Sequence, residues 1–148
     1  MRNEVKTGII LYAAADFCMA ALAWFLLLYY RKNSLGITSL SSFVDDYSNK
    51  DLWITLLFVP IFWLVMHLFS GAYFNPYRKS RFIEIYRTLI ITLLGAVILY
   101  FIFIANDQIQ DFSYYYKSFF IYLIIQFFCT SIGRILVLRG VKQRIYKG

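Results

Sequence analysis

Charged residues are scarce in this sequence. Asp, Glu, Lys and Arg make up 16% of the 148 residues, whereas hydrophobic residues make up 61%. A typical soluble domain is about a quarter charged. A water-soluble fold of this length cannot hide so much apolar surface, because small domains leave a large share of their surface exposed. We therefore predict that lipid surrounds most of the chain, as a single transmembrane domain over residues 1–148.

The residue types that carry most enzyme chemistry are also scarce. There is one histidine, His67, and the two cysteines, Cys18 and Cys129, lie inside apolar runs without forming a CxxC pair. No Walker loop, GxGxxG, GxSxG or HExxH motif occurs. The sequence thus predicts no metal site, no cofactor and no catalytic centre in this chain. The net charge of +7 comes from basic residues at the edges of apolar runs, which argues against nucleic-acid binding.

Long apolar runs are what the sequence has in place of charge. They cover about residues 8–30, 52–70, 88–105 and 118–136. A spanning helix needs about 20 apolar residues, and continuous runs favour helices over barrel strands. The predicted fold is all-α, an integral membrane four-helix bundle. We expect a kink at Pro60. The fourth apolar run is short, so the ends of that span are expected to reach into the membrane interface. The connection over 31–51 is expected to lie along the membrane surface.

The basic residues predict the orientation of these spans. With four spans, both termini and the central loop share one side of the membrane. That side holds eleven of the fifteen basic residues: Arg2, Lys6, Arg78, Lys79, Arg81, Arg87, Arg134, Arg139, Lys142, Arg144 and Lys147. Five of the eight acids lie on the other side: Asp45, Asp46, Asp51, Asp107 and Asp111. Because loops rich in Lys and Arg stay cytoplasmic, we predict that both termini are inside.

The basic island in the central loop has two interpretations. Tyr77, Arg78, Lys79 and Arg81 lie within the sequence GAYFNPYRKSRFIEIYR, residues 71–87. Clustered basic residues near a span attract anionic lipid, so the island either sets topology alone or binds a lipid phosphate or partner domain. Glu84 follows Arg81 by three residues, and we expect a local contact between them with no second acid nearby to hold a metal.

A few polar residues lie within or at the ends of the spans. Asp16 is eight residues into the first run, where an ionisable group needs a partner. We predict a structural contact between Asp16 and Arg134, and His67 is a second candidate partner. The small residues Gly95 and Ala96 are expected to allow close approach to a second copy of the chain or to a partner.

From residue 70 onward the sequence resembles the N-terminal membrane region of bacterial polyprenyl glycosylphosphotransferases, the initiating sugar transferases of exopolysaccharide and O-antigen synthesis. The resemblance rests on the Gly and Tyr of GAYF, on YRKSR, on the Glu three residues later and on the Arg of SIGR that closes the fourth run. An Asp in the first span also fits. Such proteins move a sugar-1-phosphate from a nucleotide sugar to undecaprenyl phosphate.

The resemblance implies a multi-pass protein of the bacterial inner membrane. It also implies that the catalytic Asp-Glu pair and its Mg²⁺ belong to a domain beyond residue 148, so none of the family's catalytic residues can be assigned here. The expected partners are membrane lipid, undecaprenyl phosphate, a catalytic transferase domain and a second copy of the chain. Two functions stay open: a non-catalytic anchoring and assembly domain, or a small self-sufficient four-span flippase for polyprenyl-linked sugars.

Overall fold

The structure is a computed structural model that describes residues 2–34, 49–71, 73, 80–104 and 112–147. In these residues it contains four α-helices: α1 (Arg2–Ser34), α3 (Asn49–Phe69), α4 (Arg81–Leu99) and α5 (Phe112–Lys147). A π-helical turn, η2 (Tyr100–Ile104), extends α4. The all-α helical bundle that the sequence predicts is therefore confirmed.

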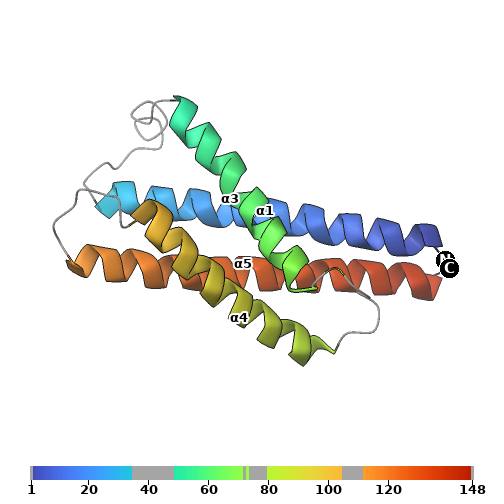
Figure 1. The fold of residues 1–148 in the computed structure, drawn as a ribbon. Helices are drawn as coiled ribbons and strands as arrows, with labels where there is room; N and C mark the ends of the chain where they lie inside the picture. The colour runs from blue at the N-terminus through green and yellow to red at the C-terminus, as the bar shows by residue number, and fades with distance from the viewer. Residues whose placement is uncertain (1, 35–48, 72, 74–79, 105–111, 148) are drawn as a thin grey trace.

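The bundle is built on two long antiparallel helices, α1 and α5 (Figure 1). The shorter helices α3 and α4 run obliquely across this pair, α3 packing mainly on α1 and α4 mainly on α5. The start of α1 and the end of α5 lie at the same end of the bundle, called the terminal end below. At about 1.5 Å per residue, α1 and α5 are each about 50 Å long, well beyond the hydrocarbon thickness of a bilayer.

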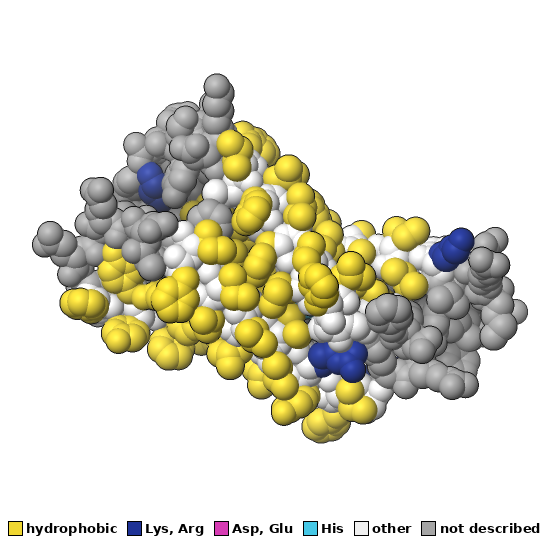
Figure 2. All heavy atoms as spheres, viewed as in Figure 1, with side chains coloured by type: hydrophobic (Ala, Val, Ile, Leu, Met, Phe, Trp, Pro, Cys, Tyr) yellow, Lys and Arg dark blue, Asp and Glu magenta, His cyan; other side chains and the backbone are white. Residues whose placement is uncertain are grey.

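Helix α5 distributes its polar residues in the reverse way to a helix of a soluble bundle. Along α5 every fourth residue is buried, and most of these are polar: Ser118, Tyr122, Gln126, Thr130 and Arg134. The opposite stripe of the same helix is exposed and apolar: Phe120, Ile124, Phe128, Ile132 and Leu136. Figure 2 shows apolar side chains across the middle of one face of the molecule. Lipid is the solvent that such an exterior requires, so this is a membrane protein.

Among the described residues, three helical segments are long and apolar enough to cross a membrane: Lys6–Asn33, Arg81–Ile102 and Phe112–Gly140. The predicted span at 52–70, the second along the chain, corresponds to a shorter apolar helix, Trp53–Phe69. The long helices extend past the apolar runs, because the polar residues that flank these runs are also helical. The fourth run, 118–136, lies within α5, whose 36 residues extend well past it at both ends. Helix α3 continues through Pro60, and most of the predicted surface segment lies outside the described residues.

An aromatic core fills the half of the bundle away from the terminal end. The Trp63 indole of α3 donates a hydrogen bond of 2.8 Å to the Tyr122 hydroxyl of α5, and Tyr122 meets Trp24 of α1 edge to face. Gly95 of α4 lies directly against the Trp63 ring, since a Cβ built on Gly95 would come within 2.5 Å of two ring carbons. Ala96 is fully buried as well. Gly95 and Ala96 are therefore buried within this chain, where Gly95 receives Trp63 of α3, and are not exposed to another chain as predicted.

Candidate functional site

The Arg134 guanidinium is the centre of the candidate site, and it lies buried between three helices. Its Nε and Nη2 donate to the two carboxylate oxygens of Asp16 on α1, at 3.2 and 3.1 Å. Its Nη1 donates to Glu84 Oε1 at 2.9 Å and to Thr88 Oγ1 at 3.0 Å, both on α4. The planar fork of arginine suits this two-sided arrangement, because it presents five donors in fixed directions.

The contact predicted between Asp16 and Arg134 is thus present, and its geometry is side-on and bidentate. Asp16 has a further partner that the sequence did not indicate: the Tyr73 hydroxyl donates to Asp16 Oδ2 at 2.9 Å. Tyr73 follows the turn that ends α3, where Gly71 has a positive φ of 71° that favours glycine. This turn therefore brings the end of α3 to the site.

Tyr73 lies outside the spanning helices but is itself largely buried. Burial raises the pKa of its phenol well above the ordinary value, and the negative charge of Asp16 raises it further. The phenol consequently stays protonated at physiological pH and remains a hydrogen-bond donor to Asp16. A neutral donor can satisfy a buried carboxylate oxygen without adding another charge to the interior.

The ion-pair partner of Glu84 differs from the predicted one. Its carboxylate makes an ion pair with Arg134, 50 residues away in the sequence, and so has a role beyond the expected local contact with Arg81. The expectation that no second acid lies near Glu84 is also wrong, because Asp16 holds the other side of the same guanidinium. Thr88 supports the pair: its hydroxyl accepts from Arg134 and donates to the Glu84 carbonyl oxygen at 2.7 Å.

We call these five residues, Asp16, Tyr73, Glu84, Thr88 and Arg134, the Arg134 cluster. They come from α1, from the turn after α3, from α4 and from α5, so one hydrogen-bonded cluster connects the four helices. Each is at most 8% exposed. Two carboxylates and one guanidinium leave a formal charge of −1. Buried charges are tolerated only when they are paired and hydrogen-bonded, so losing the central cation would leave two buried acids unpaired.

His67 is buried and packs on the aromatic core. Its ring stacks on Trp63, with centroids 5.9 Å apart, and its Nδ1 has no hydrogen-bond partner among the described residues. The structure gives no direct hydrogen bond from His67 to Asp16 within the described part of the chain. Nor do those residues contain a group of three or more His, Cys, Asp or Glu side chains that could hold a metal ion.

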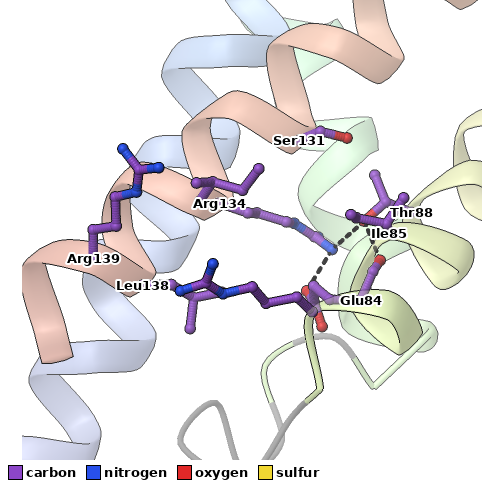
Figure 3. A pocket seen from close by; sticks show the side chains of 9 residues that line it. Glu84, Ile85, Thr88, Ser131, Arg134, Leu138 and Arg139 are labelled. Atoms are coloured by element: carbon purple, nitrogen blue, oxygen red, sulfur yellow. Dashed lines mark hydrogen bonds and ion pairs between the residues drawn. The ribbon is translucent and has the colours of Figure 1, made fainter.

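A pocket of about 270 Å³ opens beside the cluster, between α4 and α5. Its floor is formed by Glu84, Thr88 and Arg134, and Figure 3 shows Arg134 extending from α5 toward the two α4 residues. The remaining lining residues are Arg81, Ile85, Ser131, Ile135, Leu138 and Arg139. We call this the α4–α5 pocket. Of the basic island, Arg81 is exposed at this pocket, whereas Tyr77, Arg78 and Lys79 lie outside the described residues.

The sequence interpretation missed Tyr73 and Thr88 as members of the cluster. A signal for Thr88 was present, because Glu84, Thr88, Thr92 and Ala96 recur at four-residue spacing and all are buried on one stripe of α4. Polar or small residues at such spacing inside an apolar run indicate a helix–helix interface in a membrane. No comparable periodicity marks Tyr73, which lies in the turn after α3.

No family model matches this chain, and neither a curated protein nor a solved structure matches it significantly.

Proposed function

We propose that this chain is the membrane domain of an undecaprenyl-phosphate sugar-1-phosphate transferase of exopolysaccharide synthesis, which anchors and positions a catalytic domain and is not catalytic by itself. One observation carries the proposal. The residues on which the family resemblance rests include Tyr73, Glu84 and Arg134, together with Asp16 of the first span, and these four side chains meet in the Arg134 cluster.

The convergence matters because the four residues are far apart in the sequence. A chance likeness of short motifs would not be expected to bring them to one place. The role of these residues in the cluster is structural. Each carboxylate oxygen with a described partner is bound to Arg134 or Tyr73, and the guanidinium lies between the two acids. Such a cluster suits a rigid platform that holds helix ends in register for a second domain.

The proposal predicts no turnover by the purified chain. Given a nucleotide sugar, Mg²⁺ and undecaprenyl phosphate, it is expected to release no UMP above background. Sugar-phosphate transfer needs a positioned nucleophile and charge neutralisation on the diphosphate, whereas the Glu84 carboxylate is held by Arg134. Turnover that disappears on Glu84→Gln would make the chain an enzyme and overturn the proposal.

A complementation experiment tests the positioning role. In a bacterial strain that lacks its initiating transferase, a chimera joins residues 1–148 to the soluble catalytic part of that enzyme. We expect the chimera to restore polysaccharide, and Arg134→Gln in the chimera to reduce it strongly at equal membrane abundance. Lys142→Gln is the matched control, because Lys142 is exposed on the same helix. Equal restoration by an unrelated membrane anchor would contradict the positioning role.

A further inference from the structure

The α4–α5 pocket combines two exposed guanidinium groups with apolar walls. Arg81 starts α4, and Arg139 lies near the end of the apolar part of α5. Within the described residues neither guanidinium has an ion-pair partner. Ile85, Ile135 and Leu138 are apolar residues of the same lining. Two arginines flanking an apolar groove at a helix end match the chemistry of a phosphate group attached to hydrocarbon.

The charges of the site indicate how much negative charge it accepts. The Arg134 cluster carries a formal charge of −1, and Arg81 and Arg139 add two positive charges, so the pocket and its floor together carry +1. A single negative charge balances this sum. A phosphodiester carries one negative charge, and the buried acid Glu84 in the floor disfavours a group with more charge.

The lining of the α4–α5 pocket also contains a buried polar atom without a hydrogen-bond partner among the described residues. Ser131 Oγ is buried and has no hydrogen-bond partner among the described residues, and Ser131 lines the pocket. Figure 3 shows Ser131 on α5 one turn before Arg134 and on the side of the pocket away from Arg139. A buried hydroxyl without a partner is costly, and a polar group of a ligand other than the group held at Arg139 would satisfy it.

We propose that the α4–α5 pocket binds one anionic phospholipid of the surrounding leaflet, with its phosphodiester between Arg81 and Arg139. One acyl chain lies along Ile85, Ile135 and Leu138, where both isoleucines face outward from the bundle. The site differs from the basic island, because Arg139 of α5 supplies half of the positive charge. It also does not depend on the proposed transferase role, because any membrane protein with this pocket would bind the same lipid.

Native mass spectrometry of the detergent-purified chain, titrated with phosphatidylglycerol or phosphatidylcholine, tests the site. We expect a one-to-one complex with phosphatidylglycerol and weaker binding of phosphatidylcholine, whose choline would lie near the two arginines. Arg81→Gln combined with Arg139→Gln should weaken phosphatidylglycerol binding about tenfold or more, since each loses a charge-assisted hydrogen bond. Equal binding of the two lipids by the unaltered chain would overturn the proposal.

A matched control separates this site from general attraction between charges. Lys6 and Lys142 are exposed toward the same terminal end of the bundle but do not line the pocket. Lys6→Gln combined with Lys142→Gln removes the same charge and is expected to change binding less than about twofold. An equal loss in the two double variants would show that only net charge matters and would overturn the proposal.

Two further measurements keep the test independent of folding and of the phosphate source. Leu138→Trp fills the pocket without changing charge, and it should weaken phosphatidylglycerol binding while the circular dichroism spectrum stays helical. Retained binding in this variant would contradict the proposal that the lipid lies in the α4–α5 pocket.

Millimolar inorganic phosphate should leave the lipid bound, because free phosphate gains nothing from the apolar walls. Displacement of the lipid would show that the pocket takes the free anion.

Discussion

The two halves of this bundle hold the same helices together with different chemistry. Away from the terminal end, Trp24, Trp63 and Tyr122 pack as a dense aromatic core around Gly95. Toward the terminal end, the Arg134 cluster replaces packing with ion pairs. In lipid the hydrophobic effect does not drive helices together, so close packing and interhelical hydrogen bonds must do so. This protein uses one mechanism in each half.

The halves should also respond differently to substitution. In the aromatic core, stability depends on shape, so an added atom is the harmful change. In the Arg134 cluster it depends on charge balance, so removal of the shared cation is harmful whereas joint removal of opposite charges is tolerated. The following predictions compare the two halves, from the largest expected effect to the smallest.

The largest effect is expected for Arg134→Gln, which leaves Asp16 and Glu84 buried without their cation. Breaking a buried ion pair costs about 3–5 kcal/mol, and a membrane interior can reduce that cost. Asp16→Asn should cost less, since Arg134 keeps Glu84. The measurement is the unfolding free energy from circular dichroism in an SDS titration. The double variant should cost less than the sum of the single ones, and strict additivity would mean that Asp16 and Arg134 do not interact.

Gly95→Ala tests the aromatic core. The new methyl group would lie 2.5 Å from two Trp63 ring carbons, so the ring or α4 must shift. Overpacking of this kind costs about 1–3 kcal/mol. Gly140→Ala on α5 is the matched control, because nothing lies within 4 Å of its added Cβ. It should be neutral or slightly stabilising in the same titration, and an equal loss in both variants would indicate that backbone flexibility, not Trp63, explains the effect.

The smallest effects compare one hydrogen bond in each half. Tyr73→Phe removes the donor to Asp16, and Tyr122→Phe removes the acceptor of the Trp63 indole. We expect a cost of about 1 kcal/mol for Tyr73→Phe and about half of that for Tyr122→Phe, because hydrogen bonds to charged groups are stronger. Thermal unfolding in one detergent ranks the two variants. The reverse order would contradict the view that charge, and not packing, governs the Arg134 cluster.

Much of the fold follows from the sequence because apolar length is a local property. The positions of the spanning helices could be predicted from the runs at 8–30, 88–105 and 118–136, although the helix ends could not. Polar residues continue a helix into the interface without any apolar signal, which is why α5 reaches Lys147. The contact of Asp16 with Arg134 was also predictable, since an ionisable group in a span needs a partner and few candidates exist.

The sequence by itself determined that the chain is a helical membrane protein and that Asp16 must be paired. Only the tertiary structure decided the rest of the cluster: that Glu84 shares Arg134 with Asp16, that Tyr73 completes the shell of Asp16, and that Gly95 receives Trp63. The reason is physical. Apolar length and the cost of a buried charge act on each segment alone, whereas the choice of partner depends on how α3 and α4 cross the α1–α5 pair, which no single segment encodes.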